Sequence, residues 1–138
     1  YEIASCLVGS EMCIRDSIRS LSMKPPHSFP RRGLSCHFGN PWLPDAAAVL
    51  EKNANVFADL SGLLEGLFDL DELFEENSGY FSLLRTWLGY AGGYEKVMYG
   101  TDWPLVNMEQ YIHFMQCLIP EKHHEKVFYQ TAKHVYHL

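Results

Sequence analysis

The chain has 138 residues, of which 47% are hydrophobic and 14% aromatic, and its formal net charge is −6 at pH 7. This length and composition predict one globular domain with a real core and exclude a disordered chain. The acidic balance, without a stripe of basic residues, excludes nucleic acid as an expected partner. Because the apolar runs end short of membrane-spanning length, we expect no transmembrane helix and no membrane partner.

The four cysteines are widely spaced and form no CxxC pair; they are Cys6, Cys13, Cys36 and Cys117. A dense disulfide framework would need closer and more regular spacing. This cysteine usage fits a reduced compartment, so we expect a cytoplasmic protein.

Residues 1–24 differ in character from the rest of the chain. Residues 7–17 show no hydrophobic periodicity, and they resemble the translation of a widely used transposase sequencing adapter along their whole length. The alternative is an ordinary helix start whose identity with the adapter is coincidental. We therefore expect residues 1–24 to be an artefactual or non-native leader and assign the domain to residues 25–138.

From residue 33 onward, short strands alternate with amphipathic helices. Residues 33–37 are predicted to form a short strand, and Pro44 and Asp45 open a helix that ends near Asn53. Residues 56–60 form a nearly continuous apolar run, as in a parallel strand that is covered on both faces. The buried face of the intervening helix is predicted to comprise Ala46, Val49 and Leu50.

Residues 63–77 are acidic and rich in leucine, which leaves two interpretations open. The carboxylates could form a metal-binding cluster, or they could be the solvated face of a helix. We favour the solvated face because an apolar stripe lies opposite, formed by Leu64, Leu67, Phe68 and Phe74. A better helix follows over residues 80–90, ended by two glycines, and residues 97–99 are the next predicted strand. The buried positions of the helix over residues 80–90 are predicted to be Phe81, Leu84, Trp87 and Leu88.

The last part of the chain is predicted to be helical. Asn107 and Gln110 have the spacing of a capping box, which begins a helix through residue 118. Pro120 ends this helix, and residues 121–137 are predicted to form a final helix. The buried face of the first helix is predicted to comprise Tyr111, Ile112, Met115 and Leu118. We interpret the histidines of both helices as surface or packing residues; they are His113, His123, His124, His134 and His137.

Two of the predicted strands end in a single titratable residue that a turn follows. His37 precedes a Gly-Asn-Pro turn, and Asp102 follows Gly100 and Thr101. Because parallel strands end at the same edge of a sheet, His37 and Asp102 are expected to lie at one rim. An imidazole and a carboxylate there suit metal binding or proton transfer. The alternatives are a structural histidine and an aspartate that caps the next helix.

Four segments occur in the order and spacing of a known family: HFGNPW, VFADLSG, KVMYGTDWP and KVFYQTAKHVYHL. Over about residues 29–138 the chain resembles the C-terminal part of the amidohydrolase-related family, which comprises metal-dependent hydrolases and decarboxylases on a (β/α)8 TIM barrel. The resemblance implies an α/β fold that holds about strands six to eight with their helices. A complete barrel needs about 250 residues. We therefore expect an incomplete barrel that is inactive alone.

The resemblance also implies roles for individual residues. His37 matches a catalytic histidine beside the metal, and Asp102 matches a metal ligand that also transfers protons. Asp59 is expected to have a structural role or to support the residues around the metal without binding it. Trp42 and Trp103 are expected to line the substrate pocket, or alternatively to pack under the rim loops. The implied cofactor is a divalent metal, expected to be zinc in the full-length protein, and the implied partner is a small-molecule substrate. The sequence leaves open whether the protein forms a homo-oligomer.

The sequence departs from the family pattern in its metal ligands. No His-x-His occurs in the chain, and the strand-five histidine has no counterpart. Two ligands are fewer than the three protein ligands of a catalytic zinc site. The expected function is hydrolysis of C–N or C–O bonds by a metal-activated water in the full-length protein. The alternatives are a decarboxylase of the same superfamily and a non-enzymatic α/β module that self-associates through strand edges.

Overall fold

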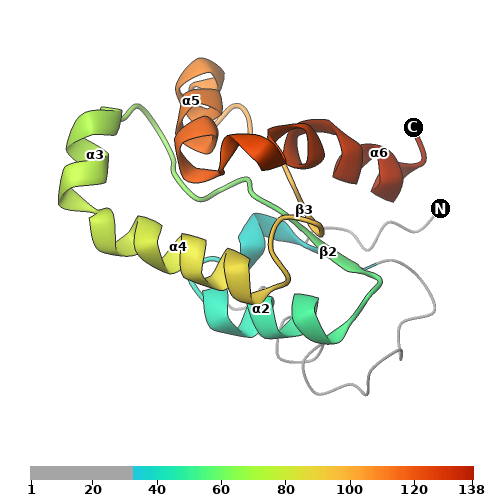
Figure 1. Cartoon of the computed structure of the whole chain (residues 1–138). Coiled ribbons are helices and arrows are strands. Elements are labelled where there is room, and N and C mark those ends of the chain that lie inside the picture. The colour runs from blue at the N-terminus through green and yellow to red at the C-terminus, as the bar shows by residue number, and fades with distance from the viewer. Residues whose placement is uncertain (1–32) are drawn as a thin grey trace.

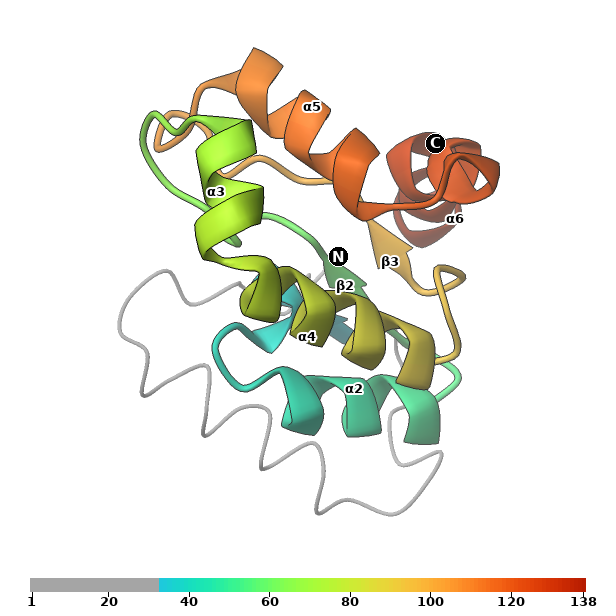
Figure 2. The same ribbon diagram turned by 60° about the vertical axis from the view of Figure 1, so that its left-hand side comes forward.

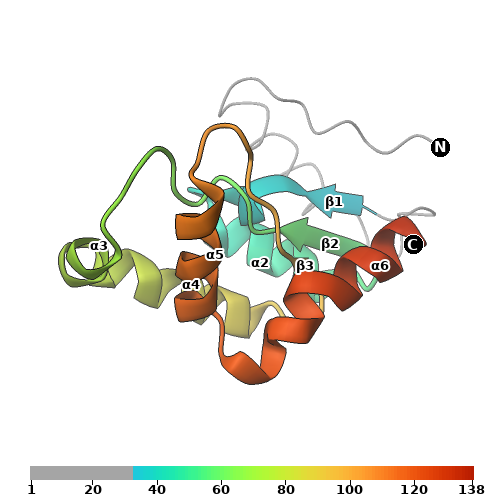
Figure 3. The ribbon, with the colours of Figure 1, turned by 90° about the horizontal axis from the view of Figure 1, so that it is seen from above.

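Three short parallel strands form a single sheet in the computed structural model, which describes residues 33–138. The strands are β1 (Gly33–Ser35), β2 (Val56–Asp59) and β3 (Val97–Met98), in the order β1-β2-β3. Leu34 pairs with Phe57, and Asp59 pairs with Met98. The three strands therefore end at the same edge of the sheet, as predicted for a series of strand–helix units (Figure 3).

Helices connect the strands and cover the sheet (Figures 1 and 2). The α-helices are α2 (Leu43–Lys52), α3 (Leu70–Glu76), α4 (Ser78–Tyr90), α5 (Met108–Leu118) and α6 (Thr131–Tyr136). Shorter helical turns are η1 (Cys36–Gly39), η2 (Glu121–His123) and the π-helical η3 (Lys126–Gln130). No helix within residues 33–138 is long and apolar enough to cross a membrane. The leader assigned to residues 1–24 lies outside the described residues.

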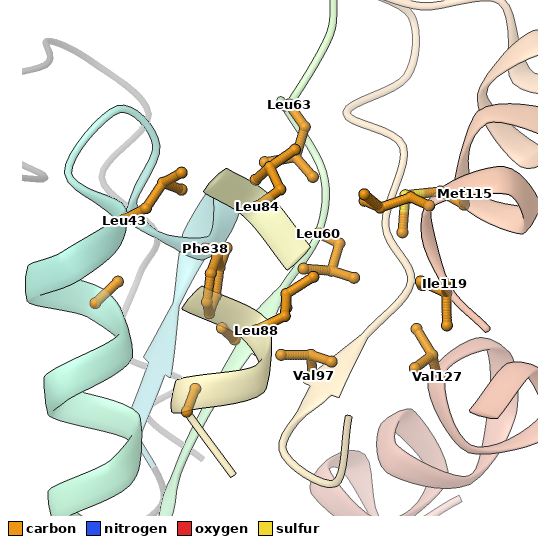
Figure 4. Close-up of a cluster of buried hydrophobic side chains, with 14 of the residues drawn as sticks. Phe38, Leu43, Leu60, Leu63, Leu84, Leu88, Val97, Met115, Ile119 and Val127 are labelled. Carbon is orange, nitrogen blue, oxygen red and sulfur yellow. The ribbon is translucent and has the colours of Figure 1, made fainter. Parts of the chain in front are cut away.

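The core lies between the sheet and the helices that follow its strands. Helices α2 and α4 contact each other and lie side by side along the sheet (Figure 2). Leu60, Leu84 and Leu88 are fully buried there, and Met115 of α5 belongs to the same cluster (Figure 4). Burying a Leu or Phe side chain fully contributes about 1.5–3 kcal/mol, so each member of this cluster stabilises the fold.

The helices with clear boundary signals begin and end close to the predicted residues. Pro44 lies in the first turn of α2, and Asn53 follows its last residue. The Asn107 side chain accepts a hydrogen bond from the Gln110 backbone N–H at 3.0 Å, which confirms Asn107 as the N-cap of α5. The reciprocal bond of a capping box does not form, because the Gln110 side chain donates to the Phe68 carbonyl at 3.0 Å instead. The buried positions predicted for α2 are confirmed, and so are Phe81, Leu84 and Leu88 of α4.

Two predicted stripes are wrong in part. Helix α3 covers only the second half of residues 63–77, and Leu67 is 82% exposed. The first half is irregular because Gly66 has a φ of 75° and its N–H donates to the Leu105 carbonyl at 2.8 Å. On α5, Ile112 is exposed and Phe114 is fully buried in its place, since positions 111, 114, 115 and 118 share one face.

The final segment is also less regular than predicted. Residues 121–136 are helical throughout, as predicted, but the helix type changes from the 3-10 turn η2 through the π-helical η3 to α6. Val127, at the start of η3, is fully buried, and its carbonyl accepts a hydrogen bond from the Tyr99 N–H at 2.8 Å. This bond ties the segment to the end of β3. Tertiary contact with the sheet therefore competes with a continuous α-helix here.

A buried tyrosine fixes the segment that follows β2. The Tyr111 hydroxyl of α5 donates to the Leu60 carbonyl at 2.5 Å and accepts from the Leu63 N–H at 3.3 Å. The Tyr80 hydroxyl of α4 donates to the Leu63 carbonyl at 3.1 Å. Burial raises the pKa of Tyr80 to about 12 and also raises the pKa of Tyr111, so both hydroxyls keep their protons at neutral pH.

Tyr111→Phe is expected to destabilise the chain by about 1–3 kcal/mol, because it leaves the buried Leu63 N–H without an acceptor. Urea unfolding followed by circular dichroism measures the change. Tyr90→Phe is the matched control, since Tyr90 is 55% exposed. A Tyr111→Phe variant as stable as the Tyr90→Phe variant would contradict the role assigned to the buried hydroxyl.

Candidate functional site

His37 lies in the turn η1, two residues after the end of β1, and its neighbours hold this turn in place. His37 and Phe38 have φ values of 57° and 47°, in the left-handed region that costs a residue with a side chain roughly 1–2 kcal/mol. Phe38 is fully buried in the core, and the Asn40 N–H donates to the His37 carbonyl at 2.9 Å. Burial of the neighbouring ring thus offsets the backbone cost and fixes where the imidazole sits.

Asp59 and Ser61 join His37 to the end of the central strand. Oδ1 of Asp59 accepts hydrogen bonds from the His37 backbone N–H at 3.2 Å and the Ser61 backbone N–H at 3.0 Å. The Ser61 hydroxyl donates to the same oxygen. The Ser61 oxygen also lies 2.9 Å from Nδ1 of His37. These contacts fit the structural role expected for Asp59.

Two glycines make room for this arrangement. Gly62 has a φ of 59°, and a Cβ at that position would lie 2.3 Å from Nδ1 of His37. A Cβ on Gly100 would lie 3.1 Å from the Cβ of Ser61 and 3.6 Å from Oδ1 of Asp59. The imidazole therefore packs directly on the Gly62 backbone, and the segment after β3 approaches the Asp59 carboxylate closely at Gly100.

Asp102 follows β3 on the other side of the central strand. It is half-buried and has a φ of 58°, and its carbonyl accepts from the Leu105 N–H at 3.0 Å. The strand order places β2 between His37 and Asp102. Both residues lie at the carboxyl edge of the sheet, but no hydrogen bond or ion pair joins their side chains within the part of the chain that the structure describes. Their pairing in one catalytic site stays a prediction.

The two predicted pocket residues differ in exposure. Trp42 is half-buried and directly precedes α2. Trp103 is 69% exposed, and its backbone N–H donates to the Thr101 hydroxyl at 3.3 Å. An exposed indole beside Asp102 could contact a substrate, whereas Trp42 is placed closer to the core. The assignment of both side chains to a substrate pocket is untested by these contacts and stays a prediction.

The described residues do not by themselves form a complete metal centre. Between residues 33 and 138, no three His, Cys, Asp or Glu side chains gather closely enough to hold an ion. The acidic residues 65–76, for which a metal cluster was the alternative, form no such group either. A catalytic zinc normally has three protein ligands, so the donor set present here does not fit a full zinc site.

Sequence reasoning missed Ser61. The signal lies in the pair Asp59 and Ser61, which follows the apolar run of β2 with a spacing of two residues and is followed by Gly62. At this spacing, a strand end presents a carboxylate and a hydroxyl toward the same side. The hydroxyl's contact with His37 depends on the pairing of β1 with β2, which sequence spacing alone does not supply.

Comparison with known proteins identifies the family and agrees with the fold. The model of the amidohydrolase family matches residues 27–138, so the chain belongs to that family. A crystal structure of an amidohydrolase from Burkholderia multivorans with bound zinc is similar, with a TM-score of 0.67 and 18% identity over 93% of this chain. Another, from the same organism with bound HEPES, gives a TM-score of 0.66 and 18% identity over 93% of the chain. No curated protein matches the chain.

The match defines the fold more sharply than the activity. The chain spans 50% of the length of each of these two structures, so its α/β fold corresponds to part of an amidohydrolase barrel. At 18% identity the likeness establishes a shared fold alone. Membership of the amidohydrolase family and the α/β class are confirmed, while the roles of His37 and Asp102 stay predictions.

Gly62→Ala is expected to displace the His37 ring, because the new Cβ would overlap Nδ1. Unfolding in urea measures the stability, and the histidine signals in the NMR spectrum report the ring's surroundings. Gly66→Ala is a matched control: Gly66 also has a positive φ of 75°, but a Cβ there meets nothing within 4 Å. We expect only Gly62→Ala to shift the His37 signals. If both variants lose the same stability and neither shifts the His37 signals, backbone strain and not overlap with the ring is what disfavours a side chain at position 62.

Proposed function

We propose that this chain is the part of a metal-dependent amidohydrolase barrel that holds about strands six to eight, with β1, β2 and β3 in those places. The observation that carries the proposal is the family match over residues 27–138, combined with the placement of His37 and Asp102 at one carboxyl edge. In barrels of this type, the residues that follow the strands at this edge perform the chemistry. The proposed reaction is hydrolysis of a C–N or C–O bond in a small-molecule substrate.

His37 and Asp102 have different tasks in this proposal. The imidazole accepts a proton and returns it, which is the commonest task of a histidine in general acid–base catalysis. The Asp102 carboxylate is a metal ligand and holds the attacking water by charge-assisted hydrogen bonds. Trp103, exposed beside Asp102, offers an apolar surface for the substrate. Trp42 borders the same pocket on the side of β1.

The metal requires ligands beyond the described residues. The solved relative with bound zinc supports zinc as the ion of the complete enzyme. Residues 33–138 would contribute Asp102 as a ligand and hold His37 at the same carboxyl edge, and the remaining ligands would come from another part of the barrel. The chain alone is accordingly proposed to be inactive. A decarboxylase of the same superfamily would use the same rim, so the reaction measured in the complete enzyme distinguishes the two.

In the complete enzyme, Asp102→Asn is expected to lower turnover by about 100-fold or more, because it removes the carboxylate charge and one proton-transfer group. A panel of lactones, esters and amides tests hydrolysis, and carbon dioxide release from aromatic carboxylates tests the alternative reaction. Asp71→Asn is the matched control, since Asp71 is exposed in the first turn of α3. Full activity of Asp102→Asn, with the fold intact by circular dichroism, would remove Asp102 from the mechanism.

The 138-residue chain is expected to retain far less than one zinc ion per molecule after gel filtration, because the described residues hold no complete ligand set. Elemental analysis by mass spectrometry measures the bound metal. The complete enzyme is expected to hold bound zinc under the same conditions. One tightly bound zinc ion per 138-residue chain, lost on Asp102→Asn, would show that the chain forms a full metal centre by itself.

A further inference from the structure

The hydrogen bonds around Ser61 determine which nitrogen of His37 carries a proton. The Ser61 hydroxyl has one hydrogen and faces two partners, Oδ1 of Asp59 and Nδ1 of His37. A carboxylate can only accept a hydrogen bond, so the serine hydrogen points to Asp59. The serine oxygen then offers a lone pair to Nδ1 at 2.9 Å, and this contact is favourable only if Nδ1 bears the hydrogen.

The backbone around the carboxylate favours the same arrangement. Oδ1 of Asp59 already accepts the backbone N–H groups of His37 and Ser61, at 3.2 and 3.0 Å. The carboxylate is thereby held in place from both strands, and Ser61 is buried with 8% exposure. The hydrogen bonds therefore run in one direction, from the imidazole to the hydroxyl and from the hydroxyl to the carboxylate. None of these groups can rotate away without leaving a buried partner unsatisfied.

We propose that Asp59 and Ser61 are positioning residues that hold His37 as the neutral Nδ1–H tautomer, with the lone pair on Nε2 available to accept a proton. Nε2 forms no hydrogen bond with any residue in the range 33–138, and Gly62 packs against the Nδ1 side of the ring. The task of Nε2 in catalysis rests on the function proposed above, whereas the tautomer itself does not.

The same arrangement argues against Ser61 as a nucleophile. In a serine hydrolase, the histidine takes the proton of the serine hydroxyl, and a carboxylate orients the histidine from its other nitrogen. Here the hydroxyl lies between the imidazole and the carboxylate, and its hydrogen points away from the histidine. Ser61 would have to give its proton directly to Asp59 to become nucleophilic. Its contacts instead transmit the orientation of Asp59 to His37.

NMR of the 138-residue chain labelled with 15N-histidine tests the tautomer directly. Two-bond 1H–15N correlations distinguish the Nδ1–H from the Nε2–H form, at a pH well above the ordinary histidine pKa of about 6.5. The signals missing from the His37→Gln variant assign His37. We expect His37 to show the Nδ1–H pattern in the unmodified chain. The Nε2–H pattern there would overturn the proposal.

Variants separate the positioning role from a merely structural one. Ser61→Ala is expected to shift His37 toward the Nε2–H form that free imidazole side chains favour, and Ser61→Thr is expected to keep the Nδ1–H form. Ser82→Ala is the matched control, because the Ser82 hydroxyl donates to the Ser78 carbonyl on the solvent-exposed face of α4. An unchanged tautomer in folded Ser61→Ala would contradict the proposal. If Ser61→Ala does not fold, the unmodified chain and Ser61→Thr still decide the outcome.

Turnover of the complete enzyme then tests the consequence. Ser61→Ala is expected to lower kcat by about 10-fold to 100-fold with little change in KM, as for other residues that orient a catalytic group. Ser61→Thr should recover most of the loss. If the NMR data show the Nδ1–H form but no hydrolysis is found, the positioning role of Asp59 and Ser61 stands and the proposed function fails. If hydrolysis is found but His37 shows the Nε2–H form, the positioning role of Asp59 and Ser61 is overturned and the proposed hydrolase function stands.

Discussion

A single carboxylate oxygen, Oδ1 of Asp59, connects the ends of β1 and β2. It accepts the His37 N–H, the Ser61 N–H and the Ser61 hydroxyl. Three donors on one oxygen lock the turn after β1 to the turn after β2, although both turns contain residues with positive φ. Hydrogen bonds to a charged acceptor are worth more than neutral ones, about 1.5–3 kcal/mol each. This carboxylate therefore holds the candidate site in shape.

The two tyrosines beneath this segment complete the support. Tyr111 and Tyr80 satisfy the backbone groups of Leu60 and Leu63, and these two residues flank Ser61 and Gly62. The loop after β2 is thus held by helices α4 and α5, which lie far apart in the sequence from β2. A loop fixed at both ends by buried hydroxyls loses little further entropy when a ligand binds. The His37 part of the site is preorganised in this sense.

The sequence predicts elements whose boundaries are encoded locally. Pro44, Asn53 and Asn107 mark helix ends through their own backbone chemistry, and α2 and α5 follow these signals. Residues 63–69 and 121–130 depart from prediction because their backbone groups bond to distant partners, such as Leu105 and Tyr99. Hydrophobic periodicity carries no information about such partners.

The same distinction explains how much of the candidate site was predictable. His37 and Asp102 each follow an apolar strand and precede a turn, so sequence spacing places them at one edge. Ser61 also follows an apolar strand and precedes a glycine, but that spacing does not reveal its role, because the hydroxyl meets Nδ1 of His37 at 2.9 Å only when β1 pairs with β2. A strand-end residue is visible in sequence, whereas a bond between two strand ends is not.

The two halves of the candidate site differ in how they are held. His37 receives its orientation from Asp59, Ser61 and Gly62, which all belong to the neighbouring strand or its loop. Asp102 follows a strand of only two paired residues. Within the described residues, its carbonyl accepts a local turn hydrogen bond from the Leu105 N–H. In a closed barrel, each strand end also gains support from the next strand around the ring. The position of Asp102 thus depends on the rest of the barrel more strongly than the position of His37.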